Sequence, residues 1–128
     1  MAKLTASQRE FLNEIFVECE LDKGDTYANN QFQIITRAGI EKIQATKNIR
    51  VEYTLERCER DFVVVRATGQ MPGGSSPITT FGSATPENCR SKYLVEMAEK
   101  RALARCVLKV AGLYRHGFMG DDEIDGKG

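Results

Sequence analysis

Positively charged side chains recur at helical spacing along one segment near the C-terminus of this 128-residue chain. At about 100° per residue, a helix over residues 85–114 places four of them along one flank, namely Arg90, Arg101, Arg105 and Lys109. Adjacent helical turns are roughly 5.4 Å apart, a spacing comparable to the phosphate repeat of an extended nucleic-acid strand. Such a row predicts binding of a polyanion rather than covalent chemistry. The same pattern also fits the solvated half of an ordinary amphipathic helix.

The same helix has an apolar side that predicts docking on a sheet. Six residues share this side, namely Tyr93, Met97, Ala104, Val107, Leu108 and Ala111. Thr85, Pro86 and Glu87 are typical of an N-cap, a first-turn proline and a carboxylate that compensates the helix dipole. Gly112 predicts the end of the helix. We therefore expect the helix to pack on a sheet while it still presents its cations to solvent.

The rest of the chain predicts an α+β fold with the element order α-β-α-β-β-β-α. A capping-box pattern at Ser7–Glu10 begins a first helix over residues 7–19, and a short apolar strand follows at 32–35. Thr36 caps a second helix over 37–47, which Asn48 closes. The remaining strands form an antiparallel β-meander of three to four strands, with the long C-terminal helix packed on one face; they are expected at 49–56, 62–68 and 78–81.

Strict alternation marks the first strand of this meander. The apolar residues Ile49, Val51, Tyr53 and Leu55 alternate with polar ones. This period of two predicts one buried face and one solvent-exposed face. The glycine-rich segment 69–77 predicts a hairpin loop, because no Gly-Lys-Ser/Thr sequence follows it as in a phosphate-binding loop.

Length and composition predict one domain over residues 1–119, followed by an acidic tail over 120–128 that is expected to be flexible. The chain is 41% hydrophobic, and its 18 basic and 18 acidic residues give a formal net charge of zero. A chain without net charge has no global field that attracts a polyanion. Any binding of nucleic acid must therefore come from a local patch.

No arrangement of residues predicts catalysis or a metal site. The four cysteines, Cys19, Cys58, Cys89 and Cys106, form no Cys-x-x-Cys pair, and His116 is the single histidine. Four carboxylates are expected on an exposed strand face and a turn, unlike the converging ligands of a metal-dependent nuclease; they are Glu52, Glu56, Glu59 and Asp61. No nucleophile has a recognisable general base. We expect a protein that is not an enzyme and that uses no metal or cofactor.

The compartment is predicted from the same sequence. Residues 1–9 lack the apolar core of a signal peptide, and no run approaches the roughly 20 apolar residues that span a bilayer. We therefore expect a cytoplasmic protein with free thiols and no membrane partner.

Several motifs resemble those of phage single-strand annealing proteins of the RecT/Redβ type. In that family a Lys/Arg-rich helix with an Ala-Arg pair ends in Ala-Gly-Ile/Leu-Tyr and runs into an acidic stretch. Here Ala104-Arg105, the segment 111–114 and the acidic segment 121–123 match in order, and the segment 34–43 is similar to the family's strand-then-helix. The β-β-β-α core also resembles that of the eukaryotic annealing mediator of homologous recombination. The resemblance covers roughly residues 30–124.

The resemblance implies binding of single-stranded DNA, annealing of complementary strands without ATP, and assembly into homo-oligomeric rings or filaments. It implies a role in phage-type DNA recombination and repair within a bacterial host cell. The family's positive groove maps here onto Arg101, Arg105, Lys100, Lys109, Arg37 and Lys42. Beside them, Tyr27 is expected to be exposed, where it can stack on bases. Two departures are the short chain and a body that is less basic than a strong DNA binder needs.

Two other classes of function remain open from the sequence. A protein-interaction or assembly module would use the apolar and mixed-charge helix faces and would not bind oligonucleotides. A metal-dependent nuclease would consume DNA in the presence of magnesium or manganese.

Overall fold

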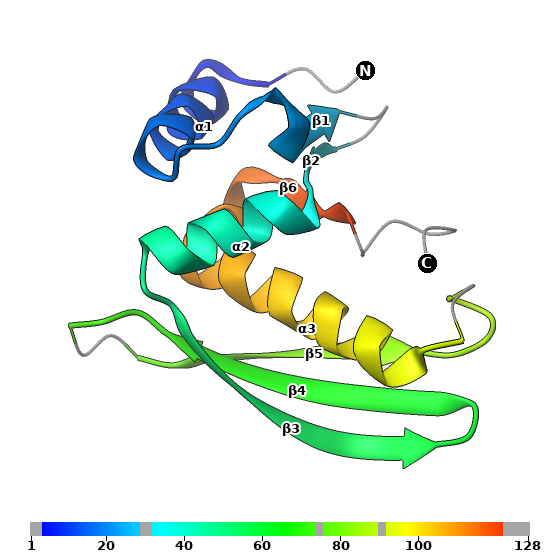
Figure 1. The fold of residues 1–128 in the computed structure, drawn as a ribbon. Coiled ribbons are helices and arrows are strands. Elements are labelled where there is room, and N and C mark those ends of the chain that lie inside the picture. The colour runs from blue at the N-terminus through cyan, green and yellow to red at the C-terminus, as the bar shows by residue number, and fades with distance from the viewer. Residues whose placement is uncertain (1–3, 29–31, 74–75, 90–91, 122–128) are drawn as a thin grey trace.

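A computed structural model describes residues 4–28, 32–73, 76–89 and 92–121 of the chain (Figure 1). The predicted α+β fold is confirmed, with three helices and two small sheets. The elements in chain order are α1 (Ala6–Glu18), β1 (Thr26–Ala28), β2 (Gln33–Ile35), α2 (Arg37–Thr46), β3 (Arg50–Glu59), β4 (Phe62–Gln70), β5 (Ile78–Ala84), α3 (Leu94–Val110) and β6 (Phe118–Gly120). Short 3-10 turns lie at Lys23–Asp25 and Tyr114–His116.

The predicted meander is the larger layer. Strands β3, β4 and β5 pair antiparallel in that order, and α3 lies between this sheet and α2 (Figure 1). Alternate residues of β4, including Val63, Val65 and Ala67, are buried beneath α3 together with Ala98 and Ala102 of the helix. β-branched residues favour such a pleated, half-buried surface, which is why this run folds as a strand.

Gly82 of β5 lets α3 approach the sheet very closely. A Cβ atom at this position would overlap the Ala98 carbonyl oxygen and the Ala102 amide nitrogen of α3. Both obstacles are backbone atoms of a regular helix, so they cannot move aside independently. The close approach of α3 to the sheet therefore requires glycine at position 82.

The smaller sheet was not predicted as a sheet. It has the order β1-β2-β6, in which β2 pairs antiparallel with β1 and parallel with β6. Its strands have three residues each, too short for a period of two to be recognised. Ile34, Ile35 and Phe118 of this sheet are fully buried. The sheet thus anchors the C-terminal segment beside α2.

The starts of two helices differ from the sequence prediction. Thr5, rather than Ser7, caps α1 in a reciprocal capping box with Gln8. Helix α3 begins at Leu94, whereas the sequence predicted a start after Thr85. Residues 86–88 form a turn that Thr85 and Asn88 close with reciprocal side-chain hydrogen bonds. The capping signal at Thr85 was real, but it closes an isolated turn instead of a helix.

Other boundaries agree with the prediction. Thr36 Oγ1 accepts a hydrogen bond from the Gly39 amide at the start of α2, and Asn48 follows that helix with a left-handed φ of 52°. Gly112, with φ of 85°, follows the end of α3. Tyr93 was expected on the apolar side of α3 but is 68% exposed at the helix N-cap, so this expectation is wrong.

Strand β3 departs most from its predicted environment. Tyr53 and Leu55 pair with the buried Ala67 and Val65 and therefore lie on the α3 side of the sheet, yet they are 42% and 52% exposed. Within the described part of the chain, β3 has β4 on one side and no strand on the other. Helix α3 covers β4 and β5 and leaves most of β3 uncovered. The predicted buried face of this strand is therefore wrong beyond Val51.

The predicted tail begins later than expected. Gly120 belongs to β6 and pairs with Ile35, and Asp121 is also described, so the domain extends at least to residue 121. The expected flexibility of residues 122–128 lies outside the described residues. Within the described residues, no helix is both long and apolar enough to cross a membrane.

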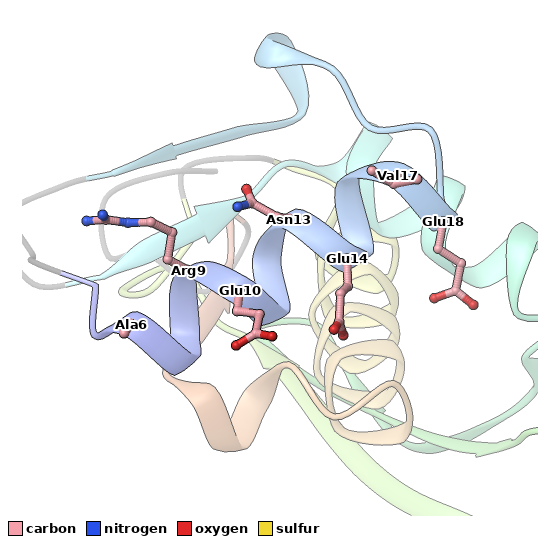
Figure 2. A pocket seen from close by; sticks show the side chains of 7 residues that line it. All are labelled: Ala6, Arg9, Glu10, Asn13, Glu14, Val17 and Glu18. Atoms are coloured by element: carbon pink, nitrogen blue, oxygen red, sulfur yellow. The ribbon is translucent and has the colours of Figure 1, made fainter.

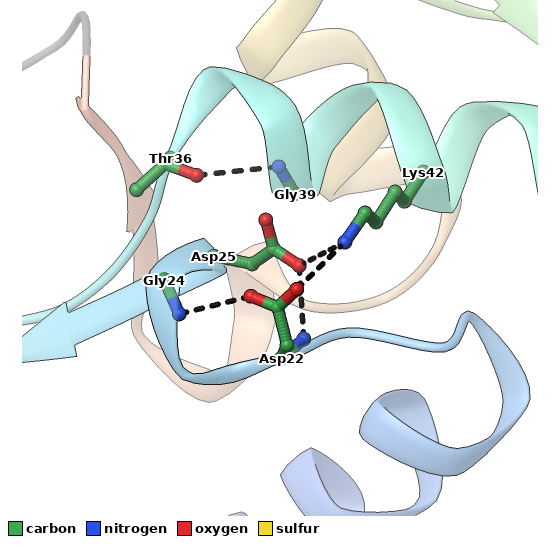
Figure 3. A network of polar contacts seen from close by, with 6 residues as sticks. All are labelled: Asp22, Gly24, Asp25, Thr36, Gly39 and Lys42. Atoms are coloured by element: carbon green, nitrogen blue, oxygen red, sulfur yellow. Dashed lines mark hydrogen bonds and ion pairs between the residues drawn. The ribbon is translucent and has the colours of Figure 1, made fainter.

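An ion pair between the buried Asp25 and the partly exposed Lys42 fixes α2 against the turn that precedes β1. The Asp25 carboxylate accepts hydrogen bonds from Lys42 Nζ at 2.6 Å and from the Asp22 amide at 2.9 Å (Figure 3). The Asp25 carbonyl also accepts the Thr36 amide at 2.8 Å. Burial acts to raise the pKa of the Asp25 carboxyl. The interactions of the carboxylate with Lys42 and Asp22 outweigh burial, so its pKa lies below the usual value.

This ion pair predicts an acid-sensitive stability. Because the pKa of Asp25 is depressed in the folded state, its contribution is complete above the unfolded pKa of about 3.9 and is lost as pH falls through the folded pKa. We expect Asp25→Asn to lower the melting temperature near neutral pH. The difference from the wild type should narrow progressively as pH falls below about 4 and through the lower folded pKa of Asp25. Thermal melts across pH, with the exposed Asp61→Asn as control, check this; a constant difference would contradict it.

Candidate nucleic-acid interface

The predicted row of exposed cations on α3 does not form. Arg101 is 7% exposed, and its guanidinium donates to the Ser83 carbonyl at 2.8 Å and to the side-chain and backbone oxygens of Asn88 at 2.9 and 2.6 Å. Ser83 belongs to β5, and Asn88 belongs to the connection between β5 and α3. The solvent exposure predicted for Arg101 is therefore wrong, because its side chain holds this connection against the helix.

The other cations of the predicted row contact different parts of the protein. Arg105 is half-buried and donates to the Phe81 carbonyl of β5 at 2.9 Å. Lys109 is exposed, with its Nζ 5.6 Å from the centre of the Tyr114 ring. Arg90 lies outside the described residues. The structure thus shows no trough shared by Arg101, Arg105 and Lys109 within the described residues.

Lys42 is likewise held in a structural contact. Its Nζ lies 2.6 Å from Asp25 and 3.4 Å from Asp22 (Figure 3). The pKa of Lys42 is raised, mainly by the hydrogen bond to Asp25, and partial desolvation opposes this shift. Two carboxylates already lie beside this ammonium group. Lys42 is therefore a weak candidate for the phosphate contact that the sequence suggested.

Two of the predicted cations line the same recess. Arg37, at the first position of α2, and Lys100, on α3, line one small recess together with Asp121. Ile40, Leu103 and Ala104 form the apolar remainder of its wall. On a helix of about 100° per residue, Lys100 lies roughly 140° away from Arg105, so it faces α2 while Arg105 faces β5. We call this site the Arg37–Lys100 recess.

Tyr27 contacts Asp121, one of the residues that line this recess. Its hydroxyl donates a hydrogen bond to Asp121 Oδ1. Tyr27 comes from β1, and Asp121 directly follows β6. The two strands flank β2 in the smaller sheet, and this arrangement brings their side chains together. Of the sequence-predicted candidates, Arg37 and Lys100 thus line the recess, and Tyr27 contacts Asp121, a third lining residue.

A second tyrosine, Tyr53, was placed on a buried face by the sequence analysis. The pKa of the Tyr53 phenol is raised, mainly because the side chain is partly desolvated and then because of the Glu99 carboxylate, while the Arg37 guanidinium opposes the shift. The charges of Glu99 on α3 and Arg37 on α2 therefore both act on this phenol. Its partly exposed ring faces the helix side of the sheet. The signal that could have revealed it is the position of β3 at the start of the meander, where an edge strand is expected.

The charges around the recess nearly balance. Arg37 Nε lies 3.9 Å from Glu41, an exposed pair of the kind that contributes little to stability and exchanges readily for another anion. Glu99 lies on the Tyr53 side and Asp121 inside the recess. A site of two cations, two tyrosines and nearby carboxylates can bind phosphates and bases, but its electrostatic attraction alone is weak.

The apolar hollow along α1 does not form a comparable site. Ala6, Asn13 and the exposed Val17 lie along it, and Glu10, Glu14 and Glu18 project from the same helix (Figure 2). All its lining residues come from one helix, so no second element closes it into a groove. Three carboxylates at i, i+4 spacing would repel a polyanion. In the described segments, no three His, Cys, Asp or Glu side chains gather as a metal site would require.

Comparisons with protein-family models, with curated proteins and with solved structures give no match for this chain. The resemblance to the RecT/Redβ type therefore rests on the motifs in the sequence. The side chains around the recess carry the functional argument that follows.

Proposed function

We propose that this protein binds single-stranded DNA across the Arg37–Lys100 recess and promotes annealing of complementary strands without ATP, in phage-type recombination. The observation that supports this function best is that Arg37 and Lys100, from two different helices, line one recess together with Asp121, which accepts the Tyr27 hydroxyl. The sequence resemblance to the annealing proteins points to the same ligand. The proposed ligand is thus the one that the sequence predicted, but the cations that bind it are Arg37 and Lys100 instead of the predicted row on α3.

Phosphates and bases contact different parts of this site in the proposed mode. Arg37 and Lys100 bind phosphate oxygens, which positions the strand without reading its sequence. Arg37 also stands at the N-terminus of α2, where backbone amides favour an anion. Tyr27 and Tyr53 offer aromatic faces to bases, and stacking on them contributes about 1–3 kcal/mol per base. Base edges that remain exposed can then pair with a second strand.

The proposal predicts a specific loss on charge removal. We expect Arg37→Gln/Lys100→Gln to weaken binding of a fluorescent oligothymidylate about tenfold at low salt. The salt dependence, as the slope of log K against log salt concentration, should become shallower by about 1.4 because two phosphate contacts are lost. Fluorescence anisotropy measures both quantities, and an annealing assay with complementary labelled strands should show a matching loss of rate.

A matched control separates a site from general charge effects. Arg9→Gln/Lys23→Gln removes one arginine and one lysine that are exposed on α1 and on the turn before β1. When both double variants are measured at physiological salt, this control should bind within about twofold of the wild type, because exposed charges more than about 8 Å from the bound strand are largely screened there. Equal effects of the two double variants would contradict the recess as the binding site.

A second candidate function is assembly through β3. This ten-residue strand has no neighbour on its outer side within the described residues, and it exposes Tyr53 and Leu55. Unpaired edge strands are templates for pairing with another chain. Homo-oligomers formed in this way would extend the proposed DNA site from one protomer to the next. A protein that forms oligomers but binds no oligonucleotide even at low salt would favour the assembly function alone.

A further inference from the structure

The two outer edges of the larger sheet differ in their surroundings. At one edge, the Phe81 carbonyl of β5 accepts a hydrogen bond from Arg105 of α3 at 2.9 Å. The Ser83 carbonyl of β5 accepts one from Arg101 of the same helix at 2.8 Å. The other edge is β3, which has no strand on its outer side and no side chain donating to its backbone within the described residues (Figure 1). The β3 edge is therefore the open one.

A β-bulge sets how far regular pairing can run along β3. Leu55 and Arg57 pair with consecutive residues of β4, so Glu56 between them is the extra residue of the bulge. A bulge interrupts the ladder of hydrogen bonds and bends its strand. The regular part of β3 therefore begins at Arg50 and ends where the bulge begins, at Leu55 and Glu56.

The regular part of β3 has an apolar row on one face and a polar row on the other. The apolar row lies on the α3 side and consists of Val51, Tyr53 and Leu55. The polar row lies on the opposite side and consists of Arg50, Glu52 and Thr54. Glu56 extends the polar row, because its carboxylate lies 3.3 Å from Nε of Arg66, the residue that pairs with Thr54. An added strand must match both rows at once.

The same strand of a second copy matches both rows in one antiparallel register. In this register Tyr53 lies opposite Tyr53 of the second copy. On the apolar face, Val51 lies opposite Leu55 of the second copy. On the polar face, Arg50 lies opposite Glu56, so that opposite charges meet. The two-fold axis produces each of these unlike pairs twice.

Other antiparallel registers are disfavoured by charge or by face. A slip of one residue places the apolar row of one strand opposite the polar row of the other. A slip of two residues keeps the faces but places Glu52 opposite either Glu52 or Glu56 of the second copy, and like charges directly opposite are destabilising. The charges of β3 therefore select the register that is centred on Tyr53.

We propose that β3 pairs antiparallel with β3 of a second copy of this chain, with Tyr53 on the two-fold axis. Each copy contributes three strands, so the dimer has one continuous sheet of six. Both copies use the same edge, so the contact closes as a dimer and does not propagate into a filament. This inference rests on the assembly candidate above and does not depend on DNA binding.

Exchange of the paired charges tests the register. Arg50→Glu and Glu56→Lys each place like charges opposite each other in a homodimer. We expect either variant alone to dimerise about tenfold more weakly than the wild type in sedimentation equilibrium. An equimolar mixture forms a heterodimer in which both ion pairs return, and it should dimerise within about threefold of the wild type. The matched controls on α1, Arg9→Glu and Glu14→Lys, should equal the wild type both alone and mixed.

Cysteine scanning tests the same register by distance. Cys58 is the exposed one of the four native cysteines, so the scan uses a Cys58→Ser background. Directly opposite residues are about 4.5–5.5 Å apart, within disulfide range, whereas diagonal neighbours are about 7–8 Å apart. We therefore expect Tyr53→Cys to form a disulfide-linked dimer with oxidised glutathione. Glu52→Cys and Thr54→Cys should react about tenfold more slowly.

The outcomes separate this inference from the DNA-binding proposal, because neither test contains DNA. Recovery of dimers in the mixture, with fastest crosslinking at position 53, supports the inference. A wild type that stays monomeric at about 1 mM overturns it and leaves the edge to a strand of another protein. No recovery in the mixture, or faster crosslinking at position 52 or 54, also overturns it. A protein that dimerises as proposed but binds no oligothymidylate at low salt loses the DNA-binding function alone.

Discussion

Gly82→Ala is expected to destabilise the protein by about 3 kcal/mol, a large part of the total stability of a domain of this size. The new methyl group would overlap the Ala98 carbonyl oxygen and the Ala102 amide nitrogen. The φ of Gly82 is not in the left-handed region, so the cost is steric rather than conformational. Helix α3 would have to move away from β5 and lose its buried contacts with the sheet. Urea unfolding followed by circular dichroism measures the change.

Gly24→Ala is the matched control for this substitution. A Cβ atom at Gly24 would meet Asp22 Oδ1 at 3.4 Å, an ordinary van der Waals distance. We expect its free energy of unfolding to stay within about 0.5 kcal/mol of the wild type. Equal stability of Gly82→Ala and Gly24→Ala would show that α3 does not approach the sheet as closely as described.

Arg101→Met is expected to lower the free energy of unfolding by about 2–4 kcal/mol. Methionine retains an apolar stem but leaves the Ser83 carbonyl and both Asn88 oxygens without the donors that they have now. Buried or partly buried acceptors that lose a charged donor remain desolvated without a hydrogen bond, which lowers the free energy of unfolding. The connection between β5 and α3 should loosen as well, which hydrogen exchange of residues 85–89 would detect.

Arg105→Met tests whether this cost is specific to Arg101. Arg105 is less buried than Arg101, and its guanidinium donates a hydrogen bond to the Phe81 carbonyl. We expect its loss to cost less than about 1 kcal/mol. If Arg101→Met instead kept full stability and lost affinity for single-stranded DNA, Arg101 would be a phosphate ligand, as the sequence pattern first suggested.

Local signals explain the parts of the fold that could be predicted. The caps of α2, the glycine after α3 and the strand expected at 62–68 depend on residues within a few positions of one another, and the structure confirms them. The start of α3 was misplaced because Thr85 and Asn88 form the hydrogen bonds of a cap around an isolated turn. A capping pattern predicts the hydrogen bonds of a single turn. It does not predict whether a helix continues after that turn.

The candidate site depended on contacts that no local pattern contains. Helical periodicity grouped Arg101 and Arg105 correctly on one flank of α3, but it could not show that β5 and its following connection supply acceptors for both. Tyr53 was assigned to a buried face because alternation gives the side of a strand. Whether a helix covers that side is decided by packing.

The sequence by itself determined the types of the main helices and strands, the order of the meander and the candidate ligand groups, because periodicity and turn chemistry act over short stretches of chain. The tertiary structure alone decided that Arg101 is a structural residue, that Arg37, Lys100 and Asp121 line one recess, and that Tyr27 contacts Asp121. The physical reason is the pairing of β2 with both β1 and β6, which brings segments far apart in sequence to one end of α2.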